Sequence, residues 1–465
     1  MTRTAVINVV GLTESLLGPA TPRLNQFLAK GKKAAIMPVF PALTCPAQST
    51  YLTGLPPSEH GIVANGWYDR ELAEVQFWKQ SDHLVQGRKV WEDLRAKDPK
   101  FTCAKLFWWY NMYSTADYAI TPRPIYPADG RKVFDIYTAP LSIRAAIKND
   151  LGEFPFPTFW GPAAGVPSPQ GPPEAASRWI AESAKWIENQ SHPTLSLIYL
   201  PHLDYNLQRL GPSHPRVPAD LKLIDEIAGD LIDFFRRQDV RVLVLSEYGI
   251  TDVNTPIHLN RLFREKGWIA IKDELGLELM DCGASKAFAV ADHQVAHVYL
   301  NDPSLEPAVR HLIEKQAGIG QVLGSGEQAA LGVSHRRSGN LIAVASERAW
   351  FTYYYWLEDR LAPDFARCVD IHRKPGYDPV ELFLDPRLSL PSIKIAWRLL
   401  QKKLGFRMLM DVIPLDATLV KGSHGIRPSD PKNYPLIIAE DSSLLPDVAV
   451  PSTDVCQIIK RHVLG

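Results

Sequence analysis

The chain has 465 residues, of which 46% are hydrophobic and 22% are charged, so it can bury a large core as one large domain with an insertion or as two to three domains. The formal net charge is zero, which leaves no overall basic field for a nucleic-acid backbone or an anionic lipid surface. No apolar run reaches about 18 residues, so no membrane-spanning helix is expected.

The N-terminal segment and the cysteines bear on the cellular compartment of the protein. Met-Thr-Arg-Thr followed by AVINVVGL is typical of a first buried strand and too short for a signal peptide. The five cysteines are scattered, odd in number and without CxxC spacing, which indicates reduced thiols. These features predict a cytoplasmic protein.

Short apolar runs alternate with helical patterns along the chain. The runs are rich in Val, Ile and Leu, as in central parallel strands covered on both faces; they are TAVINVVGL, TLSLIYLPHLDY (194–205), VRVLVLSEYG (240–249) and PLIIAED (435–441). Residues 21–33 and 218–238 carry apolar positions at helical spacing. The alternation predicts an α/β fold with a mostly parallel central sheet flanked by helices.

The middle of the chain follows another pattern. Residues 281–419 begin near AFAVADHQVAHVYL, continue with a helix-like SLEPAVRHLIEKQ and end in a stretch rich in Pro and Arg. We expect this region to be an inserted α+β cap, with residues 1–280 and 420–465 forming the core domain.

Residues 38–69, PVFPALTCPAQSTYLTGLPPSEHGIVANGWYD, contain the main candidate for chemistry. A lone Thr before Cys-Pro is usually a strand end or a helix N-cap. The whole segment, however, closely resembles the nucleophile segment of the nucleotide pyrophosphatase/phosphodiesterase family of the alkaline phosphatase superfamily. It has the Pro-x-Phe-Pro-x-x-Thr run, a TG-x-x-P-x-x-HGI element and an Asn before Tyr-Asp. The resemblance implies an alkaline-phosphatase-like fold in which Thr44 attacks phosphorus and Asn65 steadies a phosphoryl oxygen.

Three later segments are similar to the metal-binding motifs of that family. YLPHLDYNLQRLGP resembles its Asp-x-x-x-His-x-x-Gly-Pro element, LSEYGI its Ser-Asp-His-Gly-Met element, and VKGSHGIRP its late Gly-x-His-Gly element. The resemblance implies that Asp204 and His424 are metal ligands.

Four positions depart from the family pattern. Val10 stands where the first strand should supply an Asp, although Asn8 lies two residues back on the same strand face. Gln208 replaces a His, and Glu247 and Tyr248 replace the Asp-His pair. Val cannot ligate a metal, and a Tyr hydroxyl ligates well only when it is ionised.

Ligand count therefore limits the metal centre. A zinc site usually needs about four ligands drawn from His, Cys and carboxylate. We expect at most one divalent ion, most simply zinc, on Asp204 and His424, with Gln208 and Glu247 within reach. Thr44 is a weak nucleophile unless a metal or a base activates it.

Other residues are candidates for replacing the missing metal ligands in the pocket. His202 precedes Asp204 by two residues, ADHQVAH supplies His293, and VDIHRKPGYDP supplies Asp370 and His372. The alternative for each is a histidine or carboxylate that caps a loop or is hydrogen-bonded near the surface.

Two functions stay open. The first is a hydrolase of the phosphodiesterase type that attacks a small phosphorylated or anionic substrate through Thr44 with a reduced or altered metal centre; a transferase that uses the same Thr44 is not separable from it. The second is a catalytically inactive family member that binds a small anion or serves as a partner in a biosynthetic or transport assembly. We favour the hydrolase because the Thr44 segment is intact. The sequence does not give the oligomeric state.

Overall fold

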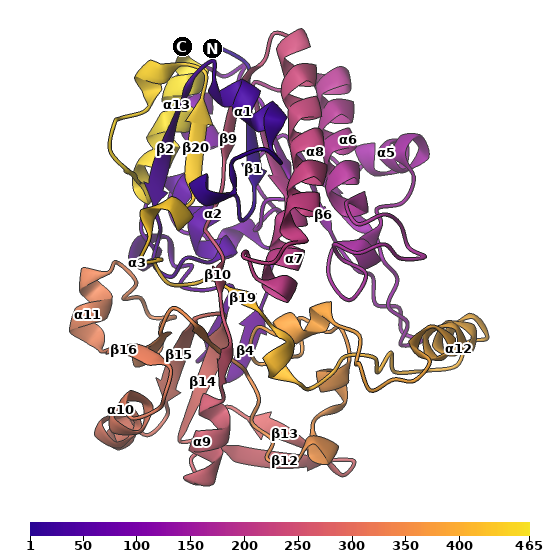
Figure 1. Ribbon diagram of the computed structural model, residues 1–465, viewed down its shortest axis with the longest axis vertical. Helices are drawn as coiled ribbons and strands as arrows, with labels where there is room; N and C mark the ends of the chain where they lie inside the picture. The colour runs from indigo at the N-terminus through magenta and orange to yellow at the C-terminus, as the bar shows by residue number, and fades with distance from the viewer.

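The computed structural model describes all 465 residues and shows an α/β protein built on two main sheets (Figure 1). The larger sheet has nine strands in the order β21-β2-β20-β9-β1-β8-β5-β6-β7. In that order their bounds are Val450–Pro451, Lys32–Met37, Leu436–Ala439, Arg241–Leu245, Thr4–Val9, Leu195–Leu200, Cys103–Leu106, Tyr118–Pro122 and Ile136–Ala139.

The centre of this sheet is parallel. β1 pairs in parallel with β8 and β9, and β5 pairs in parallel with β8 and β6. The run at 435–441 lies in the sheet as expected, but β20 runs antiparallel to both β2 and β9. The mostly parallel α/β class is therefore confirmed, and the assignment of 435–441 as a parallel strand was wrong.

The thirteen α-helices surround both sheets. Their bounds are α1 Pro22–Leu28, α2 Thr44–Thr53, α3 Pro57–His60, α4 Val90–Lys97, α5 Ile143–Leu151, α6 Ala175–Ser191, α7 His202–Leu210, α8 Val217–Arg237, α9 Leu259–Glu265, α10 Glu306–Glu314, α11 Ser325–Ala330, α12 Pro391–Lys403 and α13 Val455–Leu464. None of these helices combines the length and the apolar character that crossing a bilayer requires.

Helices cover both faces of β1, which is why all six of its residues are buried. α6 and α8 pack on one face of the central strands. On the other face, the Thr4 hydroxyl lies 3.0 Å from His462 Nδ1 of α13, and Asn8 donates to Glu247 beside α2. The sheet is thus a buried layer between two layers of helices.

Of the two helices predicted from apolar periodicity, one is confirmed over its length and the other is shorter than predicted. The pattern at 218–238 forms α8, whose apolar residues recur at helical spacing and face the core. The pattern at 21–33 was predicted too long, because α1 ends at Leu28 and residues 32–37 form β2. That strand begins with two lysines, so its start carries no apolar pattern; it forms a strand because it pairs with β20.

The second sheet has four antiparallel strands in the order β14-β15-β17-β16, with bounds Ala287–Asp292, Val295–Leu300, Leu341–Ala345 and Ile319–Leu323. Short ribbons accompany it: β3 Gly66–Asp69 with β4 Glu74–Phe77, β12 Ala270–Glu274 with β13 Leu277–Asp281, β10 Thr251–Asp252 with β19 Gly422–Ser423, and β11 Thr255–Ile257 with β18 Ala349–Phe351. Its apolar cluster draws on residues from Val253 to Val420 and also on Tyr68 and Phe77. The proposed limits of the cap, 281 and 419, stay a prediction.

A close backbone contact tests how the main sheet is joined to its C-terminal part. A Cβ added to Gly249 would lie 1.8 Å from the carbonyl oxygen of Asn433, whereas one added to Gly326 of α11 would meet nothing within 4 Å. Gly249→Ala should therefore lower the free energy of unfolding by about 2 kcal/mol or more, since overpacking forces the backbone to shift. Gly326→Ala is the matched control and should leave stability unchanged or raise it. Denaturant unfolding of both variants checks this, and equal stability would contradict the contact.

Candidate active site

A cavity of about 1650 Å³ opens at the carboxyl ends of the central strands. Asp204 follows β8 and Tyr248 follows β9, as the strand-end rule for ligand sites in such sheets requires. The second sheet and its loops contribute the facing wall. The inner end is lined by Thr44, Tyr199, Asp204, Tyr205, Tyr248, His293, Tyr377 and His424.

Thr44 is the first residue of α2 and takes part in a chain of hydrogen bonds. Its hydroxyl lies 3.2 Å from the Tyr248 hydroxyl, which donates to Asp204 Oδ1 at 3.1 Å. A hydroxyl has only one proton, so Tyr248 accepts from Thr44 while it donates to Asp204. The geometry therefore orients the Thr44 proton toward the Asp204 carboxylate.

Asp204 is buried and both of its oxygens are occupied. Oδ2 accepts a 2.8 Å hydrogen bond from Gln208 Nε2, and Gln208 Oε1 accepts one of 2.9 Å from the Tyr377 hydroxyl. Burial raises the pKa of the Asp204 carboxyl to about 7, although the bonds from Tyr248 and Gln208 oppose the shift. Asp204 can therefore take or release a proton near neutral pH.

Glu247 lies behind this chain and does not line the cavity. Its Oε1 accepts hydrogen bonds from Asn8 and Gln48, while Oε2 has no partner. Burial raises the pKa of Glu247 to about 8. Asn8 thus enters the site as expected from its position on β1, but its amide is committed to Glu247.

Four aromatic rings form a column along the cavity wall. Tyr248 stacks on His424 with ring centroids 3.6 Å apart, His424 lies 3.8 Å from His293, and His293 stacks on Tyr377 at 3.7 Å. Tyr248 and His424 belong to the predicted core, and His293 and Tyr377 to the predicted cap. The column therefore joins the two parts at the site.

Both imidazoles of the column are neutral. Nδ1 of His424 is bonded to the carbonyl oxygen of Ala42 at 2.8 Å, and Nδ1 of His293 to Asp292 Oδ1 at 2.8 Å. Burial holds the pKa of each ring well below its usual value. The Nε2 atoms of both rings have no partner, so each offers a free lone pair.

Asn65 joins Thr44 to the cap through its amide. Oδ1 accepts from the backbone N–H of Cys45 at 3.0 Å, and Nδ2 donates to Asp292 Oδ1 at 3.1 Å. The Asn65 backbone N–H donates to Asp292 Oδ2 at 2.8 Å. Burial raises the pKa of Asp292 to about 7. Asn65 therefore fixes the start of α2, and it does not line the cavity itself.

The expected metal ligands do not form a ready-made metal site. Nowhere in the protein do three side chains of His, Cys, Asp or Glu gather closely enough to hold an ion. The Tyr248 hydroxyl lies between Thr44 and Asp204. The side-chain oxygens of Asp204 and Gln208 already accept hydrogen bonds from other side chains. As arranged, these residues do not fit a divalent ion, because an ion here would first have to displace Tyr248 or Gln208.

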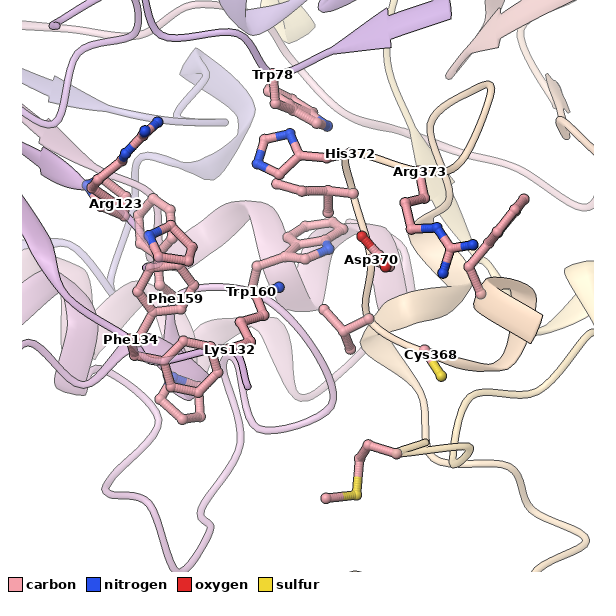
Figure 2. A pocket seen from close by; sticks show the side chains of 18 of the residues that line it. Trp78, Arg123, Lys132, Phe134, Phe159, Trp160, Cys368, Asp370, His372 and Arg373 are labelled. Carbon is pink, nitrogen blue, oxygen red and sulfur yellow. The ribbon is translucent and has the colours of Figure 1, made fainter. Parts of the chain in front are cut away.

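The additional candidates fall into two groups. His202 begins α7 with Nε2 3.2 Å from Asp220 Oδ1, and it does not line the cavity. Asp370 and His372 line the outer part of the cavity, where His372 Nδ1 is bonded to the carbonyl oxygen of Phe77 at 3.2 Å (Figure 2). They lie on the cap wall rather than beside Thr44.

The outer cavity combines aromatic rings and cations (Figure 2). Trp78 and Trp109 pack with ring centroids 4.6 Å apart, and Trp160 lies 5.7 Å from Tyr377. The basic residues of the lining are Lys79, Arg123, Arg131, Lys132, Arg373, Lys402, Lys403 and Arg407. This wall suits an anionic substrate that carries an apolar or aromatic group.

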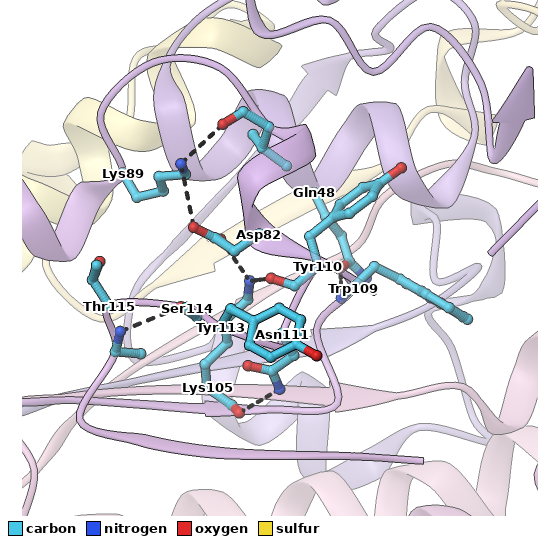
Figure 3. A network of polar contacts seen from close by, with 12 residues as sticks. Gln48, Asp82, Lys89, Lys105, Trp109, Tyr110, Asn111, Tyr113, Ser114 and Thr115 are labelled. Carbon is cyan, nitrogen blue, oxygen red and sulfur yellow. Dashed lines mark hydrogen bonds and ion pairs between the residues drawn. The ribbon is translucent and has the colours of Figure 1, made fainter. Parts of the chain in front are cut away.

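Buried charges hold the loop that carries Trp109 (Figure 3). Lys105 Nζ donates to the carbonyl oxygen of Tyr110 at 2.7 Å, and Asp82 lies within 3.8 Å of Lys105 and 3.3 Å of Lys89. The backbone N–H of Trp109 donates to Gln48 Oε1 at 2.7 Å. Gln48 therefore links this aromatic wall to Glu247.

The sequence analysis missed two residues of the site, Gln48 and Tyr377, and considered Asp292 only as part of the ADHQVAH cluster. Gln48 lies one helical turn after Thr44 on α2. Residues four apart share a helix face, so the spacing alone could have placed Gln48 beside Thr44. Asp292 and Tyr377 adjoin the histidines of ADHQVAH and VDIHRKPGYD, but only the folded chain shows that they reach Asn65 and Gln208.

His60 of the TG-x-x-P-x-x-HGI element has a structural role. The Thr50 hydroxyl lies 3.0 Å from its Nε2, and the Ile62 N–H donates to its Nδ1 at 3.1 Å. Burial lowers the His60 pKa from 6.5 to about 3. The folded protein therefore binds this proton less tightly than the unfolded chain, and the His60 contribution to stability is full above pH 6.5 and is lost as pH falls toward about 3.

Replacing this histidine should change the pH dependence of stability. His60→Gln should lower the melting temperature at neutral pH, because the link between Thr50 and Ile62 is weakened. It should also make the decline of the melting temperature below pH 6.5 shallower than in the wild type, since one buried imidazole no longer resists protonation. Thermal melts over this range check both effects, and parallel curves for the two proteins would contradict the assignment.

Comparison with known proteins shows the family of the chain. The chain belongs to the type I phosphodiesterase / nucleotide pyrophosphatase family, which matches residues 4–378. An uncharacterized pyrophosphatase/phosphodiesterase of Schizosaccharomyces pombe is 25% identical over 243 residues, which are 49% of this chain and 40% of that protein. The chain thus spans less than half the length of this curated relative. The family generally depends on divalent ions.

Solved structures share the fold over the whole chain. Murine ectonucleotide pyrophosphatase/phosphodiesterase 5 has a TM-score of 0.58 at 15% identity, covering 100% of this chain and 95% of that one. Phosphonoacetate hydrolase from Sinorhizobium meliloti 1021, in complex with phosphonoacetate, has a TM-score of 0.61 at 14% identity and the same coverage. At these identities the likeness establishes the alkaline-phosphatase-like fold.

Proposed function

We propose that the protein is a phosphoric-ester hydrolase in which Thr44 is the nucleophile. The observation that carries this proposal is the hydrogen-bonded chain from Thr44 through Tyr248 to Asp204 at the inner end of a large cavity. Thr44 Oγ forms a bond to phosphorus while the ester P–O bond breaks, the proton of Thr44 passes through Tyr248 to Asp204, and the alcohol leaves as its anion and takes a proton from solvent. Water then attacks phosphorus and loses a proton to solvent, the P–Oγ bond breaks, and Asp204 returns the proton through Tyr248 to Thr44 Oγ as the phosphate product is released.

The surroundings of Thr44 favour an anion. The N-terminus of α2 carries partial positive charge, and the Thr44 backbone N–H, which has no partner in the protein, is a donor for a phosphate oxygen. Asn65 contributes by holding the Cys45 N–H and so the start of α2; to reach a phosphoryl oxygen its amide would have to leave Asp292. Arg123 and Lys132 of the outer cavity have no carboxylate partner within ion-pair distance, so they are available to an anionic substrate.

The size of the cavity favours an ester with a bulky group. A volume of about 1650 Å³ far exceeds what inorganic phosphate needs, and Trp78, Trp109 and Trp160 supply flat apolar walls. A phosphodiester with an aromatic or extended organic group fits both parts of the cavity. Small phosphorylated compounds of this kind are the substrate class that we propose.

Substitutions along the hydrogen-bonded chain test the nucleophile. Thr44→Ala should lower kcat/KM for bis(p-nitrophenyl) phosphate by about 10³-fold or more, because no hydroxyl remains to attack, whereas Thr44→Ser should retain most of the activity. Tyr248→Phe should cost about 10²-fold or more, because Phe cannot accept the Thr44 proton. Equal melting temperatures would show that the variants are folded. Full activity of Thr44→Ala would refute the proposal.

Metal analysis separates this proton-relay site from the one-ion centre expected from the sequence. Because Asp204 and Gln208 are bonded to other side chains, dialysis against EDTA should leave the melting temperature and the turnover unchanged. Elemental analysis of the purified protein before and after dialysis checks this. One equivalent of zinc, lost together with turnover on dialysis and in His424→Ala, would overturn the relay and favour an ion on Asp204 and His424.

A specific observation also supports the second candidate, an inactive family member that binds a small anion. Tyr248 fills the space between Thr44 and Asp204, and no three metal-ligating side chains converge there. Calorimetry with adenosine monophosphate and phosphonoacetate decides between the two functions. Binding of either compound without turnover of any aryl phosphodiester, whichever divalent ion is added, would favour the inactive member.

The cysteines support a cytoplasmic location as part of the proposal. All five are free, and four of them are buried away from oxidants. Proteins of reducing compartments typically keep their thiols in this state.

A further inference from the structure

α12 is an unusual helix because none of its residues is buried. Four large apolar side chains at its surface are Ile393, Trp397, Leu400 and Leu404, exposed at 63%, 57%, 45% and 64%. Their spacing of four, three and four residues places them on one stripe along the helix. Such a continuous apolar stripe on a surface helix marks an interaction site rather than scattered exposure.

The other faces of α12 fix the helix so that the stripe points away from the protein. Lys394 and Arg398 pair with Asp411 at 2.8 and 3.0 Å, and Lys402 donates to the carbonyl oxygen of Lys132 at 3.0 Å. Ile395 and Leu399 line the cavity. Figure 1 shows α12 projecting from the side of the protein, beyond the loops that carry it.

Unpaired cations flank the stripe. Residues 390–410 contain five basic side chains, and Asp411, which follows directly, pairs with two of them, Lys394 and Arg398. Lys403 and Arg407 are exposed and have no carboxylate within ion-pair distance. A neutral chain thus carries local unpaired cations beside this stripe, although its net charge indicated no basic field.

We propose that α12 docks on the surface of an anionic phospholipid bilayer, with the stripe inserted among the acyl chains and the cations at the headgroups. A helix with an apolar stripe that includes Trp, flanked by Lys and Arg, is the type that lies in the plane of a membrane interface.

Charge also argues against the other obvious occupant, a second copy of this chain. A symmetric contact through α12 would bring the unpaired Lys403 and Arg407 of both copies close together, and juxtaposed like charges oppose association. Anionic lipid supplies the opposite charge over an extended surface. The proposal is independent of the chemistry at Thr44, but docking would bring the cavity mouth, where Ile395 and Leu399 lie, to the lipid surface.

Flotation with lipid vesicles tests the docking. The full-length protein should float with vesicles of phosphatidylcholine and phosphatidylglycerol, bind weakly to phosphatidylcholine alone, and lose binding at high salt. The double variant Trp397→Ser with Leu404→Ser should reduce the bound fraction about tenfold or more, because two partly inserted side chains are removed. Lys403→Glu with Arg407→Glu should remove the preference for phosphatidylglycerol.

Matched controls exclude a general effect of surface change. Val448→Ser replaces an apolar residue that is 71% exposed in the loop between β20 and β21, and Lys30→Glu reverses an exposed charge after α1; neither should affect binding. Brominated phosphatidylcholine should quench tryptophan fluorescence on binding, and Trp397→Phe should lose most of that quenching while still binding.

Two results would overturn the proposal. One is the absence of flotation with phosphatidylglycerol vesicles, or flotation that the α12 variants do not change. The other is a dimer, seen by sedimentation without lipid, that the Trp397→Ser, Leu404→Ser variant dissociates; this would assign the stripe to a protein interface.

Discussion

The site depends on the hydroxyl group of Tyr248. It lies within 3.2 Å of Thr44 and 3.1 Å of Asp204, and its single proton fixes the direction in which the Thr44 proton points. The ring is held flat against His424, so the hydroxyl has little freedom to move away. Burial raises the pKa of Asp204 to about 7, although the hydrogen bonds from Tyr248 and Gln208 oppose the shift. At a position where the family resemblance implies a metal ligand, this chain has a hydroxyl that lies between Thr44 and Asp204.

The second sheet contributes directly to the site. Asp292 holds the Asn65 amide and backbone, and His293 completes the ring column at the tight turn between β14 and β15. Tyr377 reaches Gln208 and so acts indirectly on Asp204. The nucleophile segment is thus positioned from both sides, by the main sheet through α2 and by the second sheet through Asp292.

The sequence allowed prediction of the elements whose signal is local. β1 and α8 follow from local apolar patterns. Of the residues expected to share one pocket, Thr44, Asp204 and His424 line the cavity, whereas Asn65 and Glu247 lie behind its lining. The direction of β20 could not be predicted, because a short apolar run reads alike in both directions. The pairing of Tyr377 with Gln208 joins positions 169 residues apart, which no local pattern reveals. His202 was a plausible ligand by spacing, but the start of α7 turns it toward α8 and Asp220.

The ring column has a consequence for how the two sheets are coupled at the site. Tyr248 and His424 are carried by the main sheet side, and His293 and Tyr377 by the second sheet side, at separations of 3.6 to 3.8 Å. Of the three ring pairs, only His424–His293 joins the two sides, so a hinge opening between them would lose one such contact, which contributes about 0.5–1.5 kcal/mol beyond burial. His293 is thus the one ring of the second-sheet side that touches the main-sheet half of the column, so replacing it would separate the two sides while Tyr248 stays stacked on His424.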